Sequence, residues 1–238
     1  MSEWEKAAIL IPQPTGLWEE TPTVGTLRNT KDNINSMKIE SIKLRCDGYV
    51  TCRSYFCTYF GSISSKNEYT FTKGVNRLEG EVDEEFWPAS YLIGMKSARP
   101  RDFMIFEEAD VSINGQKCPF GEAEKYACYM DTLYPAFGGR KSVRRLVFEA
   151  LKKNGSNKTV DEVKNIFCLD DQRFERPVNA VGNEQYRAMA AIGYSMGKQV
   201  YCFPWFSRKR YESYHKNLSW LMEMLENLEM TVILPIGK

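Results

Sequence analysis

Histidine is almost absent from this chain of 238 residues, which contains a single one, His215. A Ser/His/Asp or Cys/His catalytic arrangement would have to use it. His215 stands between Tyr214 and Lys216 in a stretch of helical spacing, where a histidine that packs or faces solvent is the simpler interpretation. The cysteines include no CxxC pair, and His215 has no partner at zinc-ligand spacing. We therefore predict no catalytic residues, no metal site, no cofactor and no enzymatic activity.

Long apolar runs and an excess of one charge are also missing. The runs Ala7–Ile11 and Met230–Ile236 are too short to span a bilayer, and nothing resembles a signal peptide. The sequence has 32 Lys and Arg against 31 Asp and Glu, so long-range self-repulsion is weak and association is favoured. We expect a soluble protein that is made in the cytosol, binds itself, and has no membrane and no specific nucleic-acid partner.

The sequence has no glycine-rich phosphate loop. Gly138–Ser142 (Gly-Gly-Arg-Lys-Ser) is similar to the end of a P-loop, but Arg140 separates the glycines from the lysine and no earlier glycine has the right spacing. The basic clusters Arg140–Arg145 and Ser207–Arg210 lie in a chain that is neutral as a whole, whereas a nucleic-acid binder usually has a basic domain. We interpret them as surface charge or nuclear import signals.

Residues 91–106 combine two apolar runs with a cationic corner. Tyr91–Met95 and Phe103–Phe106 have the composition of strands, and Pro100 pushes the residue before it towards extended backbone. A rigid corner of this kind suits contact with another surface. We predict that its charged residues are assembly contacts: Lys96, Arg99, Arg101 and Asp102.

Local patterns predict one mostly β domain over residues 37–238, with helical insertions, after an N-terminal arm over residues 1–36. The expected strands are two within Met37–Phe60, joined by a turn at Asp47-Gly48, and further ones at Tyr69–Thr72, Phe86–Met95, Phe103–Val111 and Thr231–Ile236. The expected helices are Glu122–Leu133, Arg144–Lys153, Val160–Phe167 with Thr159 and Glu162 as a capping box, and the amphipathic Tyr211–Leu228. Glu184–Met196 fits either helix or strand. Asn114-Gly115 is a turn signal.

One segment favours an enzyme instead. Ala191–Phe203 resembles a helix-turn-strand of the nucleoside deoxyribosyltransferases, in which a helix carries a catalytic glutamate and ends at Gly-Lys before a strand. Only Glu184 lies near enough to match that glutamate. A nucleoside-processing transferase is therefore an alternative function.

Three blocks in order resemble the baculovirus-type polyhedrins and granulins, which form crystals around insect-virus particles. The first block is Tyr91–Phe106, with Met95, Lys96, Arg99, Pro100 and Phe106 in place. The second is Glu175–Arg187, with Pro177, Val181, Gly182, Asn183, Glu184, Tyr186 and Arg187. The third is the helix Tyr211–Leu228 followed by Val232–Gly237. The chain is thereby identified as a distant relative of that family.

The resemblance implies a β-sandwich of jelly-roll type whose trimers pack into a crystalline lattice around virions in the host nucleus and later outside the cell. It implies Tyr186 and Arg187 as further assembly contacts and Cys202 as a cysteine that can crosslink copies. Tyrosines become anionic and lysines lose their charge above about pH 10–10.5, so such a lattice would dissolve there. A nuclear viral matrix or capsid protein is a further alternative.

Overall fold

The computed structural model describes residues 37–53, 58–63, 68–80, 88–94, 105–119, 122–132 and 134–238. All of them belong to the compact unit Met37–Lys238. The predicted arm over residues 1–36 and the predicted contacts Lys96, Arg99, Arg101 and Asp102 lie outside the described residues. Within the described part, no helix has both the length and the apolar character needed to cross a membrane.

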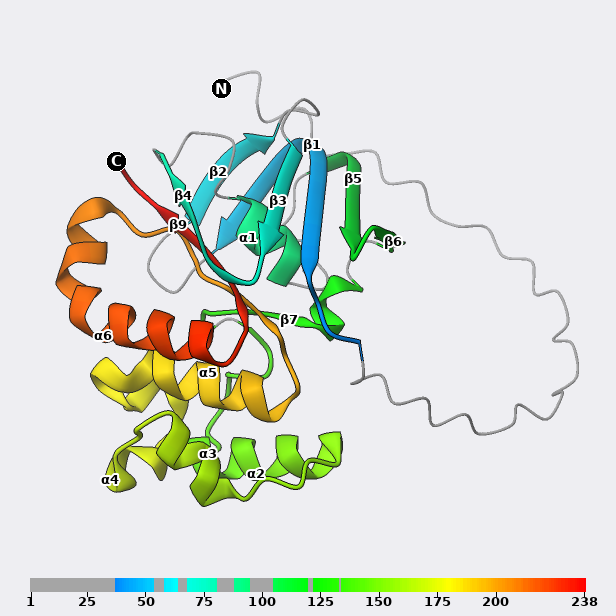
Figure 1. Ribbon diagram of the computed structural model, residues 1–238. Coiled ribbons are helices and arrows are strands. Elements are labelled where there is room, and N and C mark those ends of the chain that lie inside the picture. The colour runs from blue at the N-terminus through cyan, green and yellow to red at the C-terminus, as the bar shows by residue number, and fades with distance from the viewer. Residues whose placement is uncertain are drawn as a thin grey trace, which may run out of the picture. The chain divides into compact units, whose positions relative to one another are not determined.

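An antiparallel sheet forms one part of the unit (Figure 1). Its strands are β1 (Ser41–Arg53), β2 (Thr58–Ile63), β3 (Glu68–Thr72), β5 (Ile105–Ile113) and β6 (Gln116–Cys118). The order is β2-β1-β5-β6, and β3 pairs with β1 as well. The predicted turn at Asn114-Gly115 is confirmed, because both residues have positive φ (51° and 78°) and join β5 to β6 as a tight hairpin.

The predicted turn at Asp47-Gly48 is wrong. β1 runs through these residues without reversing, and its register against β5 shifts between them, which marks a β-bulge. Asp-Gly is a turn signal only where no neighbouring strand continues the ladder. Here β5 lies alongside β1 on both sides of the bulge.

A parallel sheet forms the second part. Its strands are β4 (Gly74–Glu79), β7 (Ala127–Tyr129), β8 (Val200–Cys202) and β9 (Thr231–Ile236), in the order β4-β9-β8-β7. All three pairings are parallel, and such pairings need crossover connections, which helices usually provide. The chain passes from one sheet to the other between β3 and β4, where Gly74 has a φ of 86°.

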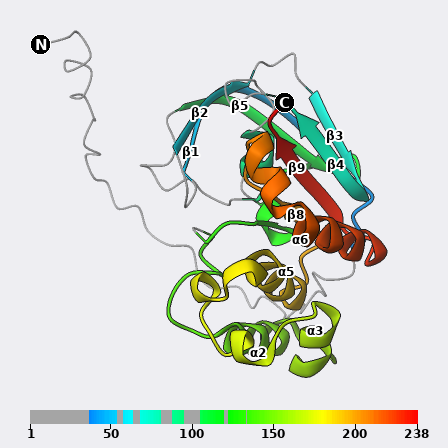
Figure 2. The same ribbon diagram turned by 90° about the vertical axis from the view of Figure 1, so that its left-hand side faces the viewer.

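Most helices gather at the end of the unit away from the antiparallel sheet, whereas the first helix, residues 88–94, lies next to β1 and β2 of that sheet (Figures 1 and 2). The helices are α1 (Pro88–Gly94), α2 (Val143–Asn154), α3 (Val160–Ile166), α4 (Asp171–Phe174), α5 (Gln185–Ser195) and α6 (Arg208–Asn227). The predictions for α2, α3 and α6 are confirmed, including the Thr159/Glu162 capping box. The ambiguous stretch Glu184–Met196 is helical.

Two predicted elements have the wrong type. Phe86–Met95 was expected as a strand, but its described part is α1, which begins at Pro88 and buries Ala89, Leu92 and Ile93 on one face. Glu122–Leu133 was expected as a helix, but it contains a short 3₁₀ turn followed by β7. Ala89, Leu92 and Ile93 of α1 and all three residues of β7 are buried, so apolar spacing in these stretches does not separate a covered face from an exposed one.

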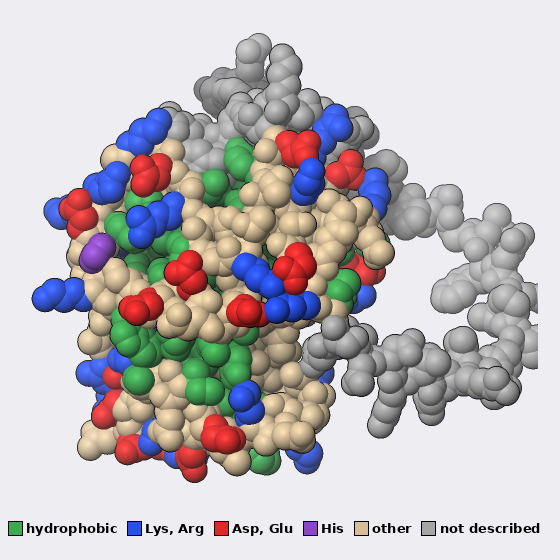
Figure 3. Space-filling model, in the orientation of Figure 1, with side chains coloured by type: hydrophobic (Ala, Val, Ile, Leu, Met, Phe, Trp, Pro, Cys, Tyr) green, Lys and Arg blue, Asp and Glu red, His purple; other side chains and the backbone are tan. Residues whose placement is uncertain are grey.

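The predicted jelly-roll β-sandwich is therefore wrong, because a jelly roll consists of antiparallel sheets and this chain has a parallel sheet joined by helices. The chain has a mixed α/β fold. In Figure 3, hydrophobic side chains gather on the face over α5 and α6, where Tyr194, Trp220 and Met224 are only partly buried.

Helices α1 and α5 cover opposite faces of β7 and β8. A Cβ on Gly94 of α1 would lie 2.8 Å from the Cβ of Cys202, whereas a Cβ on Gly193 of α5 would lie 3.0 Å from the Sγ of Cys128. Side chains alternate between the faces of a strand, so the side chains of paired Cys128 and Tyr201 lie towards α5 and those of paired Tyr129 and Cys202 towards α1. The sheet is thus sandwiched by helices whose glycines allow close approach.

Candidate functional site

The carboxyl edge of the parallel sheet is the candidate site, because ligands of open α/β sheets bind outside the carboxyl ends of the strands. The four strands end at Glu79, Tyr129, Cys202 and Ile236. The next residue is glycine after β4 and β9, and it is Met130 after β7 and Phe203 after β8. The contacts of these residues determine what this edge can bind.

Backbone hydrogen bonds tie the segment after β8 across the edge. The Phe206 N–H donates to the Pro235 carbonyl at 3.1 Å, and the Gly237 N–H donates to the Phe206 carbonyl at 2.7 Å. The Trp205 indole N–H donates to the carbonyl of Gly80, directly after β4, at 3.3 Å. The segment that leaves β8 therefore crosses β9 and reaches the end of β4.

Helix α1 packs directly on the same edge. The buried Ser90 hydroxyl donates to the Phe203 carbonyl at 2.5 Å. A Cβ on Gly94 would also lie 3.1 Å from the Cα of Tyr129, so only a hydrogen side chain fits there. Side chains and backbone of the protein itself occupy the space above β7 and β8.

Aromatic side chains fill the region beside β8. The Tyr186 ring lies 5.6 Å from that of Phe203, 5.7 Å from that of Phe206 and 6.2 Å from that of Tyr214. The Arg210 guanidinium lies over the rings of Phe206 and Tyr214, at 5.5 and 5.9 Å. Burial raises the pKa of Tyr186 well above its ordinary value, so its hydroxyl stays protonated. The cluster is an apolar core that holds one cation.

The connection from β4 to α1 has the strand-loop-helix order of a P-loop, but its composition opposes phosphate. A P-loop requires glycines followed by Lys and Ser or Thr, so that backbone N–H groups and an ammonium surround the phosphates. Residues 81–87 read Glu-Val-Asp-Glu-Glu-Phe-Trp, with four carboxylates and neither glycine nor lysine. Four carboxylates in a stretch that contains no lysine or arginine would repel a polyphosphate.

The second P-loop-like stretch, Gly138–Ser142, serves a structural purpose. The Ser142 side chain is the N-cap of α2 and accepts from the Arg145 N–H at 3.3 Å. The Lys141 ammonium pairs with Glu149 at 2.7 Å. The strand before this turn, β7, ends at Tyr129, well ahead of Ser142, and Ser142 forms a β-bridge with Pro177, so the turn is held against the segment that follows α4.

Among the described residues of this edge, carboxylates that could hold Mg²⁺ and orient water are sparse. The strand β8 continues into Phe203 and Pro204, where a P-loop enzyme needs an acid to hold the metal. Asp131, two residues after β7, is a buried carboxylate at the edge. Among the residues that the structure describes, no three His, Cys, Asp or Glu side chains come together as a metal-binding group.

The structure places the predicted residues Tyr186 and Arg187 inside the fold. Tyr186 belongs to the aromatic cluster described above. Arg187 pairs with Glu184 at 3.1 Å, donates to the Cys168 carbonyl at 2.7 Å and lies 5.5 Å from the centre of the Trp220 ring. Both side chains are engaged within their own chain, which leaves little of either for a contact between copies.

Cys202, the predicted crosslinking cysteine, is completely buried in β8. Burial raises the pKa of its thiol well above the ordinary value, which disfavours the reactive thiolate. Cys202 is a free cysteine, as are Cys118, Cys128 and Cys168. A thiol at this position cannot reach a second molecule while β8 and α1 stay packed.

A buried charge cluster escaped the sequence analysis. Glu184 is only 5% exposed, and its carboxylate pairs with Arg173 at 3.2 Å and with Arg187 at 3.1 Å. It also accepts from the Asp170 N–H at 3.1 Å, so α4 and α5 are joined through one carboxylate. Glu184 and Arg187 are three residues apart on one helical face, which is a weak signal because surface pairs share it.

Lys198 is a second buried charge, in the turn between α5 and β8. Its ammonium donates to the backbone carbonyls of Glu124 and Lys125, and burial lowers its pKa. Nearby, burial raises the pKa of the Cys128 thiol to about 12. The helix-turn-strand order expected at Ala191–Phe203 is thus present, but its lysine binds main-chain oxygens.

Comparison with known proteins identifies a solved structure with a similar fold. No protein-family model and no curated protein matches this sequence. A solved structure from Pyrococcus furiosus, described as a candidate ABC transporter ATP-binding protein, is similar over 82% of this chain and 90% of its own, with 14% identity and a TM-score of 0.50. The chain shares the fold of this ATP-binding protein. At this identity the likeness concerns the fold alone.

This fold overturns the predicted function. The resemblance implied a jelly-roll protein that forms a crystalline occlusion matrix, and this chain instead has a mixed α/β fold similar to that of an ATP-binding protein. The likeness to an ATP-binding protein favours neither of the alternatives, a deoxyribosyltransferase-like enzyme and a nuclear viral matrix or capsid protein. The expectation that the chain is not an enzyme conflicts with the description of the similar structure, which names an ATP-binding protein.

Proposed function

We propose that this chain is an ABC-type subunit that does not hydrolyse ATP with its own residues and acts through contacts with other proteins. Support for the first part comes from the similar fold, with a TM-score of 0.50, and from its described ATP-binding relative. Support for the loss of hydrolysis comes from the carboxyl edge of the parallel sheet. The observation that carries the proposal is the Glu-Val-Asp-Glu-Glu-Phe-Trp connection after β4.

Phosphoryl transfer in P-loop enzymes depends on positioning and on positive charge around the phosphates. In this chain the β4–α1 connection contains four acidic residues and neither the glycines nor the lysine of a P-loop. Phe203 and Pro204 follow β8, so an acid that holds Mg²⁺ is missing from that position as well. Both changes disfavour ATP hydrolysis, because the first removes the groups that bind phosphate and the second removes a ligand of the metal.

The remaining role of such a subunit is to fill a place in an assembly. The chain keeps the two sheets and the helical region, and buried glycines keep α1 and α5 tightly packed on β7 and β8. A partner subunit can bind a rigid fold of this kind even when the fold does not catalyse ATP hydrolysis. Protein partners are therefore expected to bind surface residues of this domain.

The test is phosphate release from Mg·ATP by the purified full chain, measured alongside its Asp131→Asn variant. The proposal predicts the same background rate for both proteins. Asp131 is the buried carboxylate at the carboxyl edge, so its replacement would lower any ATP hydrolysis that this edge catalyses. Turnover that stays with the chain through successive purification steps and drops in the Asp131→Asn variant would overturn the proposal.

A further inference from the structure

Helix α2 and its flanks form the most strongly basic stretch of the described chain. Between residues 140 and 158 the sequence contains seven cations and a single acid, Glu149. The cations are Arg140, Lys141, Arg144, Arg145, Lys152, Lys153 and Lys158. The stretch belongs to the helical end of the unit, away from the carboxyl edge discussed above (Figures 1 and 2).

An apolar side chain stands in the middle of this charge. Phe148 is 45% exposed and is the one large hydrophobic residue that is exposed among the described ranges. It lines a groove of about 430 Å³ together with Ser142, Arg144, Arg145 and Val160. A groove of this size accepts one or two large side chains, and exposed apolar surface next to charge is typical of a binding site.

The outward residues of α2 are aligned. Arg145, Phe148 and Lys152 follow one another at spacings of three and four residues, so they share one face of the helix. The Arg145 guanidinium lies 5.6 Å from the centre of the Phe148 ring. In the described part of the chain, Lys152 and Lys153 at the end of the helix are exposed and form no ion pair. We call Arg145, Phe148 and Lys152 the α2 stripe.

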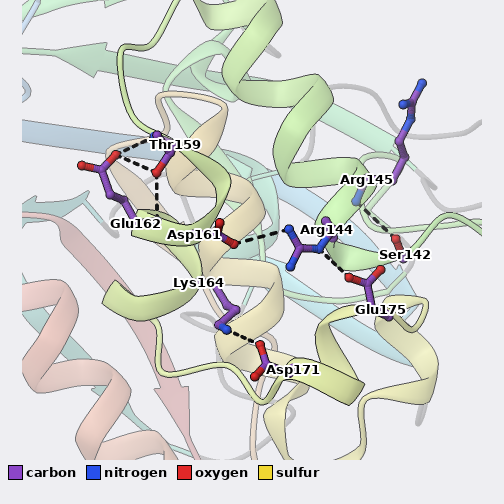
Figure 4. Close-up of polar contacts among 9 residues, drawn as sticks. All are labelled: Ser142, Arg144, Arg145, Thr159, Asp161, Glu162, Lys164, Asp171 and Glu175. Carbon is purple, nitrogen blue, oxygen red and sulfur yellow. Dashed lines mark hydrogen bonds and ion pairs between the residues drawn. The ribbon is translucent and has the colours of Figure 1, made fainter.

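Carboxylates already pair with both arginines that line the groove. Arg144 lies between Glu175, at 2.5 Å, and Asp161, at 3.4 Å, whereas the Arg145 side chain points away from them (Figure 4). Arg145 and Lys141 share Glu149. These carboxylates would repel the continuous charge of a nucleic-acid backbone or an anionic membrane. They leave room for a few separate acidic groups beside the stripe.

We propose that the α2 stripe binds an acidic segment of a partner protein that carries one large apolar side chain. The apolar side chain enters the groove against Phe148 and Val160, and flanking carboxylates face Arg145 and Lys152. The charges are complementary, and the concave groove fits a protruding side chain better than it fits a flat bilayer. This site is separate from the carboxyl edge, so the inference does not depend on the proposed function.

The test uses the full chain and a labelled synthetic peptide in which a few glutamates, spaced by glycine and serine, flank one central tryptophan, and binding is followed by fluorescence anisotropy. The proposal predicts saturable binding that weakens as salt is added, because exposed charges are screened. The same peptide with alanine in place of tryptophan is expected to bind about tenfold more weakly, as is the Phe148→Ala variant with the original peptide.

A matched charge reversal separates the stripe from general basicity. Lys152→Glu and Lys209→Glu introduce the same charge change on exposed positions of different helices. The first is expected to weaken peptide binding at least threefold and the second less than twofold. Circular dichroism checks that each variant is folded.

Three results would overturn the proposal. The first is the absence of peptide binding at any concentration up to the solubility limit. The second is equal weakening by Lys152→Glu and Lys209→Glu, which would indicate general electrostatic attraction. The third is tighter binding to phosphatidylserine vesicles or to single-stranded DNA than to the peptide, with the same loss in Phe148→Ala, which would assign the stripe to a membrane or a nucleic acid.

Discussion

Replacing Gly94 by alanine tests whether α1 closes the carboxyl edge of the parallel sheet. The added methyl group would lie 2.8 Å from the Cβ of Cys202 and 3.1 Å from both the Cα and the Cβ of Tyr129. Real Cβ atoms do not approach each other that closely, and the Cα belongs to the backbone of β7. Either α1 or β7 must therefore move.

Overpacking of a dense core costs about 1–3 kcal/mol of unfolding free energy. Alanine has a better helix propensity than glycine by about 1 kcal/mol in a helix interior, but Gly94 is the last residue of α1, so only a small part of this cost is offset. We expect a net loss of about 1–2 kcal/mol, which for a chain of this size lowers the melting temperature by about 2–8 °C. Urea unfolding followed by tryptophan fluorescence and a thermal scan both measure the change.

Gly138→Ala is the matched control. The nearest atoms to a Cβ there are the carbonyl oxygens of Pro135 and Thr132, each at 3.9 Å, which is ordinary contact. This variant should change the unfolding free energy by less than about 0.5 kcal/mol or stabilise slightly. If Gly94→Ala is no less stable than Gly138→Ala, then α1 does not pack on β7 and β8 as described.

Three further perturbations test the rest of the fold. Glu184→Gln leaves the cations Arg173 and Arg187 without their shared carboxylate and should destabilise the chain by about 3 kcal/mol in urea unfolding, whereas a loss below about 0.5 kcal/mol would count against a buried cluster. Thr159→Ala removes the N-cap of α3 and should cost about 1 kcal/mol, and no change would contradict the capping box. Unfolding free energy should fall as pH rises from about 9 to about 12, because the folded state raises the pKa of Cys128 to about 12 and only the unfolded thiol ionises below that. The Cys128→Ala variant should show a shallower fall, and an identical slope would refute this assignment.

Local chemistry in the sequence predicted the elements that carry their own boundary signals. Thr159 with Glu162, and Asn114 with Gly115, act within three residues, so the sequence alone indicates the helix start and the hairpin turn. The amphipathic spacing of α6 is equally local, because its buried face is set every three or four residues.

The parallel sheet could not be predicted in the same way. β7 contains three residues, Ala127–Tyr129, all buried, so neither alternation nor length marks it as a strand. Its partner β8 begins at Val200, and no local pattern records a pairing over that separation. Burial of Ala89, Ser90, Leu92 and Ile93 in α1 likewise removed the contrast between faces that distinguishes helix from strand.

The candidate site was hidden for a related reason. The absence of a P-loop was recognised from composition, but the place where one would stand became clear only when β4 and α1 were known to flank residues 81–87. Glutamate is usually exposed and phenylalanine usually buried, but here Glu184 is buried and Phe148 is exposed. Only tertiary structure distinguishes such positions.

The binding of Mg·ATP to the full chain, measured by isothermal titration calorimetry near neutral pH, tests the central claim most directly. The four carboxylates between β4 and α1 and the closed carboxyl edge predict no saturable heat, with any dissociation constant weaker than about 1 mM. Saturable binding with a micromolar dissociation constant would contradict the account.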